Sequence, residues 1–589
     1  MANTGVAYAR TVTRWGGCLV VLLALSSHIC ADTAVWTGEG VPQPQPVTGD
    51  VTLGVYIFPG WYRDAGRGDY PYRTHDEDSE WRLVARKPAP RPLLGFYDDS
   101  LPEVNDWHIK WALEHGISFF CFDWYWNAGE HRLLRTLEQG FLKAKYCSLM
   151  KFCIHWCNHG LDWKDREFNR PKDLDFQTPA LVEMTEYLAD NYFRLPNYIT
   201  VDGRPVLVIW DTRRILQANG GPEGFAKALE EMNRVLRDRG IGDLYLVTIG
   251  DIPDAQAAGF SARTDYGCYG ADFDSEFEWR GGYSIPYETM MAHQESRWRA
   301  VSSADGLPYM LSIGSNWDSR PRAGDAAPVI TGKTPEKFAQ QCRTALSYID
   351  GRTNLAIIEA WNEWGEGSFI EPDKECGFGM LDAVRETFTN APEQHTDLVP
   401  SPDVVGSYSV LMGQELADAR AMEEQPYPDP PRLPRSVKWE IDVPLPEGPI
   451  ARGWEFGGGS PEGWMPYQVE PFAVAEGILK TTALGDDPQL IVDNVGVPVE
   501  DLDCIALRLR TAKGVSACQL FWTTLSEPSM SADKAIVFKL VPDGEWHTYL
   551  VRKQVEGKWS GPLKILRLDI GGAGDPIELD WVRLYRRAG

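Results

Sequence analysis

The sequence is short of positive charge. It has 58 Lys and Arg residues against 84 Asp and Glu residues, which gives a formal net charge of −26 at pH 7. Nucleic-acid binding depends on clustered Lys and Arg, so this balance excludes nucleic acid as a general partner and argues against an anionic membrane surface. An acidic or sulfated sugar stays open as a ligand, because a local basic pocket can exist in an acidic protein.

Several chemistry-bearing motifs are missing as well. The sequence has no P-loop, no zinc-protease helix, no serine nucleophile elbow and no paired C-x-x-C spacing of a structural zinc site. We therefore expect no cofactor and assign no metal ligand. The closest cysteine group, Cys147, Cys153 and Cys157, is interpreted as small buried residues on or beside a strand, and metal binding is the weaker alternative.

Apolar runs of membrane-spanning length are absent after the N-terminus. Arg10 and Arg14 precede a short apolar run at residues 18–25, and small and polar residues then lead to Ala31. This order is typical of a secretory signal peptide rather than a membrane span. We expect residues 1–31 to be removed and the product to be exported to the periplasm or the extracellular space.

A chain of 589 residues is expected to contain two or three domains. From about residue 50, eight apolar strand candidates alternate with amphipathic helices. The strand candidates are 51–58, 117–126, 152–156, 206–210, 245–249, 266–269, 309–313 and 355–358. This alternation predicts an α/β fold, a (β/α)8 TIM barrel over residues 50–390, with a doubly wound open sheet as the alternative.

The composition changes after the barrel. Residues 391–440 are Pro-rich and are expected to form a linker with little regular structure. Short β-rich runs in 441–589 predict an antiparallel β-sandwich of the jelly-roll kind, which could serve as a carbohydrate-binding module. Trp454, Trp464, Trp522 and Trp559 are candidate stacking surfaces, and the alternative is a packing domain with these tryptophans in its core.

The strongest functional signal directly follows the eighth strand candidate. There Glu363 and Glu366 are interleaved with Trp361 and Trp364. Active sites of (β/α)8 barrels lie at the C-terminal ends of the strands, and a glycosidase needs one carboxylic acid and one carboxylate. We expect Glu363 and Glu366 to be catalytic and the two tryptophans to help raise the pKa of the acid. The alternative is a solvated pair of loop glutamates.

Polar and aromatic residues also follow the other strand candidates, and we expect them to bind the substrate. They are Tyr56, Trp61, Asp123, Trp124, Tyr125, His155, Trp156, Asn158, Asp211, Trp317, Arg320, Trp361, Asn362 and Trp364. Asp123, His155, Asn158 and Asp211 could equally support the residues around the site. Arg320 could instead pair with Asp318 and hold its loop.

Taken in order along the chain, segments 56–59, 120–126, 156–158, 317–318 and 360–367 resemble the WbsX-like proteins. That family is named for glycosyltransferases and is similar to the endo-α-mannosidases of glycoside hydrolase family 99. The resemblance implies that Glu363 is the base on a sugar 2-hydroxyl and Glu366 the acid/base at the glycosidic oxygen. It also implies a 1,2-anhydro sugar intermediate.

These observations predict a secreted glycoside hydrolase that cleaves an α-linked glycan, either mannan-like or modified. One alternative is a glycosyltransferase of polysaccharide biosynthesis, to which Asp272-Phe273-Asp274 would supply an Asp-x-Asp metal motif. That pattern recurs elsewhere in the chain, and export argues against a cytoplasmic nucleotide-sugar donor. The other alternative is a non-catalytic glycan-binding protein. The sequence leaves the sugar, the linkage and the oligomeric state open.

Overall fold

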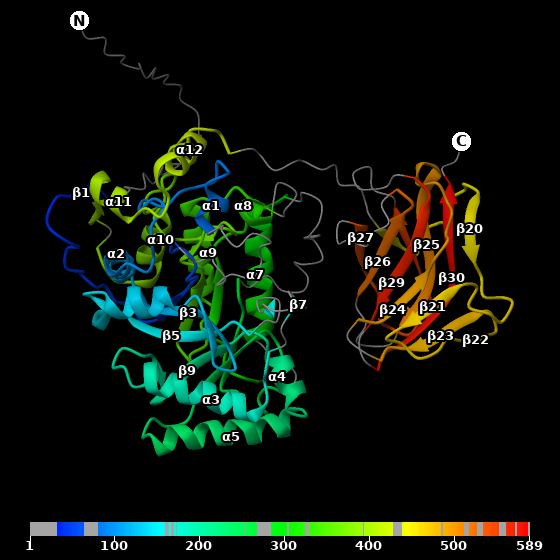
Figure 1. The fold of residues 1–589 in the computed structure, drawn as a ribbon, viewed down its shortest axis with the longest axis horizontal. Helices are drawn as coiled ribbons and strands as arrows, with labels where there is room; N and C mark the ends of the chain where they lie inside the picture. Colours follow the sequence, from blue (N-terminus) through cyan, green and yellow to red (C-terminus); the bar gives the residue numbers. More distant parts are fainter. Residues whose placement is uncertain are drawn as a thin grey trace, which may run out of the picture.

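The computed structural model describes residues 32–586 with short interruptions. The interruptions are 64–79, 159–163, 166–169, 172–173, 253, 268–283, 303–305, 324–328, 393, 428–438, 485–486, 512–516, 527–533, 553–560 and 572–573. The described residues form two units, each with its own hydrophobic core (Figure 1). The expected signal peptide and the Asp272-Phe273-Asp274 motif lie outside the described residues.

The first unit is a barrel of eight parallel strands. Along the barrel wall the strands are β11 (Ala262–Thr264), β10 (Tyr245–Ile249), β9 (Arg204–Ile209), β5 (Lys151–Trp156), β3 (Ile117–Asn127), β2 (Thr52–Ile57), β15 (Leu355–Glu359) and β13 (Leu311–Gly314). Most of these strands are apolar on both faces, as strands covered by helices outside and packed side chains inside must be. The predicted barrel is confirmed.

The sixth strand lies a few residues before its predicted position. We expected it at residues 266–269, whereas β11 covers Ala262–Thr264. The strand has only three residues, and the charged Arg263 interrupts its apolar pattern. The aromatic residues just after it gave the stronger sequence signal.

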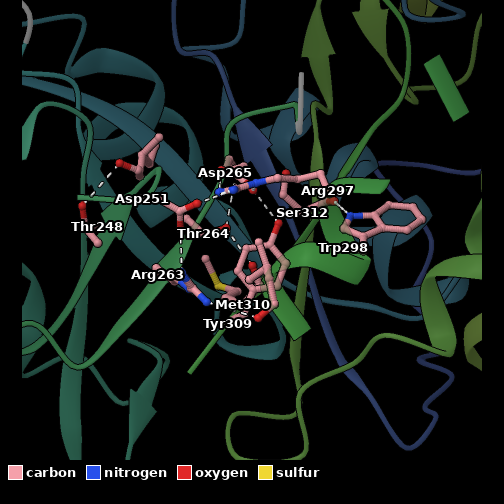
Figure 2. A network of polar contacts seen from close by, with 12 residues as sticks. Thr248, Asp251, Arg263, Thr264, Asp265, Arg297, Trp298, Tyr309, Met310 and Ser312 are labelled. Atoms are coloured by element: carbon pink, nitrogen blue, oxygen red, sulfur yellow. Dashed lines mark hydrogen bonds and ion pairs between the residues drawn. The ribbon is translucent and has the colours of Figure 1, made fainter. Parts of the chain in front are cut away.

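The barrel closes between β11 and β13 through a parallel bridge of Arg263 and Tyr309. Met310 N donates to Arg263 O at 2.9 Å, and Thr264 Oγ1 donates to Met310 O at 2.8 Å. Figure 2 shows this closure and the ion pairs that surround it. Since one bridge replaces a full strand ladder here, side chains supply much of the connection.

The ion pairs around the closure join a helix outside the barrel to residues at the ends of β10 and β11. Arg297 of α7 (Tyr287–Ser302) pairs with Asp265 at 2.9 Å and also with Asp251, and Arg263 pairs with Asp251 at 2.6 Å (Figure 2). Asp251, which follows β10, thus belongs to the barrel closure. A cavity of about 670 Å³ lies beside it, and neither Glu363 nor Glu366 lines that cavity.

Helices surround the strands. The longer ones are α2 (Pro102–Glu114), α3 (Thr178–Leu188), α5 (Pro222–Asp238), α7, α9 (Pro335–Leu346) and α10 (Gly379–Phe388). In α5, Phe225, Leu229, Met232 and Leu236 recur at helical spacing and are buried. Between β3 and β5 the chain forms the π-helical turn η1 (Thr136–Gly140) followed by the 3-10 turn η2 (Phe141–Lys143) rather than a regular α-helix. Gly140 packs so closely that a β-carbon there would lie 2.4 Å from the Asp99 carbonyl oxygen.

The segment expected to be a linker contains regular structure. Its strand β18 (Thr396–Pro400) pairs in parallel with β1 (Asp32–Trp36), and α11 (Pro402–Tyr408) and α12 (Gly413–Glu423) follow. Tyr408 and Leu411 are buried in the core of the barrel unit. The expectation of 391–440 as a linker therefore differs from the structure over 396–423. A few apolar residues are enough to dock this Pro-rich segment, although they give no clear periodicity.

The second unit is an antiparallel β-sandwich, as predicted. One sheet has the order β19 (Trp439–Ile441), β28 (His547–Arg552), β25 (Leu502–Thr511), β30 (Pro576–Arg586), β23 (Ile478–Thr482), β22 (Ala473–Ala475), with β20 (Ile450–Trp454) beside β30. The other has the order β21 (Trp464–Tyr467), β24 (Gln489–Val492), β29 (Leu563–Ile570), β26 (Ala517–Thr524), β27 (Ala535–Lys539). Both sheets contribute side chains to one core.

Three of the candidate stacking tryptophans belong to that core. Trp454, Trp464 and Trp522 are no more than 3% exposed, so their faces contact protein rather than solvent. Trp559 lies outside the described residues. Across the part of the chain that the structure describes, no helix is both long and apolar enough to cross a membrane.

Candidate active site

The two glutamates lie on a small hairpin that directly follows β15. Its strands are β16 (Asn362–Glu363) and β17 (Ser368–Phe369), which pair antiparallel. In the turn, Glu366 N donates to Glu363 O at 3.1 Å. Gly367 has a φ of +65° and approaches Asp318 so closely that a β-carbon would not fit. The turn therefore holds both glutamates at the C-terminal end of the barrel.

Asn362 fixes this hairpin to the first barrel strand. Its Nδ2 donates to Phe58 O at 3.0 Å, and its Oδ1 accepts from Phe58 N at 2.9 Å. Both side-chain groups are thus used on backbone just beyond β2. The expected substrate-binding residue Asn362 is a positioning residue here.

Arg322 of α8 (Arg320–Ala323) joins three carboxylates. It donates from Nη1 to Glu366, from Nη2 to Glu363 Oε2 at 3.2 Å and from Nε to Glu80 Oε1 at 3.1 Å. Glu80 begins α1 (Glu80–Val84) and is buried. Neither Arg322 nor Glu80 was among the residues expected to form the site. Arg322 belongs to the same motif as Arg320, whereas nothing in the local sequence marks Glu80.

The pKa of Glu363 is raised well above the ordinary glutamate value. Burial is the largest cause, and the negative charge of Glu366 adds to it, while Arg322 acts in the opposite direction. Because the two carboxyl groups interact, they titrate as a pair. The negative charge of Glu366 and the burial of Glu363 thus both favour the protonated form of Glu363.

Asp123 and His155 form a second polar group at this end of the barrel. They lie opposite each other on β3 and β5, and Asp123 Oδ1 contacts His155 Nδ1 at 2.8 Å. The charge of Asp123 also contributes to the raised pKa of Glu363, which places it near the pair. His155 Nε2 is buried and has no hydrogen-bond partner among the described residues. It can therefore meet a hydroxyl group of a ligand.

Two partly exposed aromatic residues stand beside His155. The rings of Trp210 and Tyr266 are 5.0 Å apart, and they lie 5.6 and 5.7 Å from the ring of His155. The charge of Glu363 raises the pKa of Tyr266, after burial and Asp123. Neither residue was among those expected to bind substrate. Trp210 ends the fourth predicted strand and Tyr266 lies in the sixth, so a signal was present.

Most of the aromatic residues expected to contact substrate are buried. Those exposed by no more than 2% are Tyr56, Trp61, Trp124, Trp156, Trp361 and Trp364, and Tyr125 is 7% exposed. Trp361 packs against Phe120, and Trp364 stacks on Phe369 at 3.9 Å. These rings support the end of the barrel from within and offer no open face in this structure.

The remaining expected residues hold loops together. Asn158 Nδ2 donates to Asp211 O at 3.0 Å and its Oδ1 accepts from Asp211 N at 2.7 Å. Asp211 also caps α4 (Thr212–Ala218). Arg320 binds Asp318 with two donors, at 2.9 and 2.6 Å, which is the alternative considered for it. Trp317 is half-buried against a small apolar cluster.

One group of residues at this end has the donor types of a metal site. Atoms of Asp123, His155 and Cys157 lie within 4.8 Å of one another. His155 Nδ1, however, is already hydrogen-bonded to Asp123, and Cys157 Sγ is 3.7 Å from the same nitrogen. The short contact identifies a hydrogen-bonded pair, and we assign no metal here.

The fold and this site define a (β/α)8-barrel protein with a glutamate pair, one buried and one partly exposed, at the C-terminal ends of its strands. The chain belongs to the glycosyltransferase WbsX family, whose family model matches residues 85–384.

Curated relatives of this chain carry no assigned activity in their names. The uncharacterized protein WxcX of Xanthomonas campestris pv. campestris strain B100 is 28% identical over 363 residues, which cover 56% of this chain and 48% of that protein. The same protein of strain ATCC 33913 is 28% identical over 348 residues. The chain thus spans about half the length of these relatives.

Solved structures resemble each unit at low identity. A glycoside hydrolase-like protein matches 60% of this chain and 98% of its own, at 19% identity and a TM-score of 0.42. The GH99 endo-α-mannosidase from Bacteroides thetaiotaomicron matches 64% of this chain and all of its own, at 15% identity and a TM-score of 0.37. The CBM22-1 xylan-binding domain from Paenibacillus barcinonensis Xyn10C matches 24% of this chain at a TM-score of 0.18.

Proposed function

We propose that this chain is a glycoside hydrolase that cleaves an α-linked glycan with Glu363 and Glu366. The observation that carries the proposal is the coupled pair itself. Burial and the charge of Glu366 raise the pKa of Glu363, while Arg322 donates to both carboxyl groups. Glycosidic cleavage requires one carboxyl group that gives a proton and one that takes a proton, and such a pair supplies both.

We assign Glu363 as the base and Glu366 as the acid/base, following the family resemblance. Because the pKa of Glu363 is raised, this role requires Glu363 to be ionised when substrate is bound, and its carboxylate is then a strong base toward a sugar 2-hydroxyl. The 2-oxygen would then attack the anomeric carbon and form the 1,2-anhydro sugar, while Glu366 protonates the leaving oxygen. Water opens the anhydro ring in the second step. The contact between Arg322 and the Glu366 carboxylate would open when Glu366 takes up its proton.

Substrate contacts in this proposal come from the partly exposed face beside the pair. Trp210 and Tyr266 offer aromatic rings, and His155 Nε2 offers a polar atom. Aromatic faces contact the C–H surfaces of sugars, and a buried polar atom that bonds only the ligand gives orientation.

Glutamine variants test the catalytic pair. Purified chain is incubated with α-mannans and with sulfated and uronic-acid polysaccharides, without any nucleotide sugar, and reducing ends are counted. We expect release by the wild type and a loss of at least about 100-fold in both Glu363→Gln and Glu366→Gln. Turnover that survives both substitutions would remove the pair from the mechanism.

Substrates with different leaving groups separate the two roles. An aryl glycoside with a good leaving group needs little protonation of its departing oxygen. We therefore expect Glu366→Gln to cleave such a substrate at close to the wild-type rate in the first step. Glu363→Gln should lose this cleavage. The reverse pattern would exchange the assignments.

A glycosyltransferase is the second candidate, and the family description is the observation that favours it. Sugar release from a glycan in the absence of a donor would support hydrolysis. Transfer from a nucleotide sugar to an acceptor, with no release from any glycan tested, would support the transferase. Retained glycan binding with neither reaction would support the non-catalytic alternative.

A further inference from the structure

Four side chains of the types that bind metals converge outside the glutamate hairpin. His115 caps the C-terminal end of α2, and Asp382 lies in the first turn of α10. His395 directly precedes β18, and Asp397 lies in that strand. One donor atom from each lies within 4.8 Å of all the others. Helices α2 and α10 are labelled close together in Figure 1, and they are in contact.

The histidine-to-aspartate distances in this cluster are too long for strong hydrogen bonds. His115 Nε2 is 3.6 Å from Asp382 Oδ1 and 3.4 Å from Asp397 Oδ1. His395 Nε2 is 3.2 Å from Asp382 Oδ1 and 3.6 Å from Asp397 Oδ2. A charge-assisted hydrogen bond between such groups is typically about 2.7–2.9 Å long.

Other histidines in the same chain do form short bonds to aspartates. His155 Nδ1 lies 2.8 Å from Asp123, and His547 Nδ1 lies 2.7 Å from Asp442. Longer contacts also occur, since His547 Nε2 is 3.1 Å from Asp543. In the four-residue cluster, however, every histidine–aspartate contact is 3.2 Å or longer, so none of them is a short charge-assisted bond.

We propose that His115, Asp382, His395 and Asp397 bind one zinc ion in a tetrahedral site. With metal–ligand bonds of about 2.0–2.2 Å, the edges of a tetrahedron are about 3.3–3.6 Å long. The distances of His115 and His395 to the shared Asp382 Oδ1, 3.6 and 3.2 Å, fall at or next to that range. His115 lies 3.4 Å from Asp397 Oδ1, whereas His395 approaches Oδ2 of the same carboxylate, so Asp397 would offer one of its two oxygens. Two imidazole nitrogens and two carboxylate oxygens are a donor set that zinc accepts, and four protein ligands make the site structural rather than catalytic.

The charge and burial of the cluster favour a cation. The side chains of His115 and Asp397 are 0% and 1% exposed. Two ionised aspartates beside two neutral histidines carry a charge of −2, which one divalent cation balances.

A hydrogen bond behind His115 prepares it as a ligand. Its Nδ1 lies 2.7 Å from Trp111 O, and a carbonyl oxygen only accepts, so Nδ1 carries the proton. The lone pair is thereby left on Nε2, which has no hydrogen-bond partner among the described residues. Metal-binding histidines usually have such a support for the second nitrogen. The ring of Phe378 stacks on His115 at 5.8 Å.

The site would fasten the ends of the barrel unit. Asp397 belongs to β18, which pairs with the N-terminal strand β1, while the other ligands include residues of α2 and α10. The side chains of Asp382 and His395 are 26% and 15% exposed, so an ion can enter from their side. Asp382, His395 and Asp397 share one short segment, but His115 lies far from it in the sequence, so no local spacing marks the complete set.

Metal analysis of the full chain tests the site. The protein is stripped with a chelator, reloaded with zinc or cobalt(II), desalted and analysed for metal per chain. We expect one equivalent of zinc, and the intense visible absorption of tetrahedral cobalt(II) after cobalt loading. His395→Gln, chosen because His395 is at the partly exposed side, should lose the metal. His547→Gln, which alters a histidine–aspartate pair in the sandwich, should keep it.

Thermal unfolding gives an independent readout that does not need the variant to fold well. Chelator should lower the Tm of the wild type, and zinc should restore it. The proposal would be overturned if folded wild-type protein held no metal after incubation with zinc and desalting. So would equal metal in wild type and His395→Gln, or a cobalt spectrum of octahedral type.

Discussion

The guanidinium of Arg322 contacts Glu363 across two loops of the barrel rim, with Nη2 3.2 Å from Oε2. The same side chain also binds Glu366 and Glu80. One cation therefore counters three carboxylates, and the protonation of the pair depends on it.

Removal of this cation should shift the pH profile. Arg322 lowers the pKa of Glu363, so Arg322→Met should raise that pKa further. If ionised Glu363 is the base, the acid limb of kcat/KM moves to higher pH, and activity at neutral pH falls about 100-fold. Arg214→Met, which removes an exposed partner of Asp211, is the control. An unchanged acid limb in a folded variant would argue against Glu363 as the base.

Loss of an aromatic face should weaken binding more than turnover. Trp210→Ala should raise KM about tenfold, because a contact made in both the ground state and the transition state chiefly affects binding. Steady-state kinetics on the best glycan substrate measure the effect. Trp36→Ala, at a partly exposed tryptophan on β1, should leave KM unchanged. A fall in kcat alone would instead place Trp210 at the reacting bond.

Ionisation of Glu363 should lower the stability of the folded protein at neutral and higher pH. Its pKa is raised in the folded state, so folding favours the protonated form, which predominates below the ordinary value of 4.5. That contribution disappears as pH rises through the folded pKa. Glu363→Gln should therefore become more stable than the wild type by more than about 1 kcal/mol at about pH 8, with little difference near pH 4. Urea unfolding at several pH values measures this, with the exposed Glu183→Gln as control.

The sandwich offers a comparison between a buried and an exposed aromatic residue. Trp454→Ala should destabilise the sandwich by about 3–5 kcal/mol, because it empties a core site. Tyr467, 51% exposed on β21, should tolerate alanine without loss of Tm. We propose that the sandwich binds glycan through such exposed residues. Weaker retention of Tyr467→Ala on immobilised glycan supports this, and equal retention contradicts it.

Export is a further proposal, carried by the sequence pattern of residues 1–31. Expression of the full chain in a bacterial host should yield protein outside the cytoplasm, with a mature N-terminus close to residue 31. Fractionation and N-terminal sequencing check both points. Intact chain retained in the cytoplasm would contradict the proposal.

The sequence predicted the features that depend on local pattern. Continuous apolar runs marked most barrel strands, and the Glu363–Glu366 spacing marked the hairpin after β15. The short strand with Arg263 was misplaced because a charged residue interrupted its pattern. Glu80 and Arg322 were missed because their role arises only when distant segments meet. The buried tryptophans show the same limit, since a sequence gives their number but not which faces are covered.

The two hydrogen bonds between Asn362 and the backbone of Phe58 join parts of the chain that the ribosome makes at different times. The first barrel strand is made early, yet its end is bound to the hairpin that carries both glutamates, which is made late. A ribosome-bound chain that stops before residue 360 would already contain all eight barrel strands but neither glutamate. The two glutamates therefore join the barrel only after its last strand has been made.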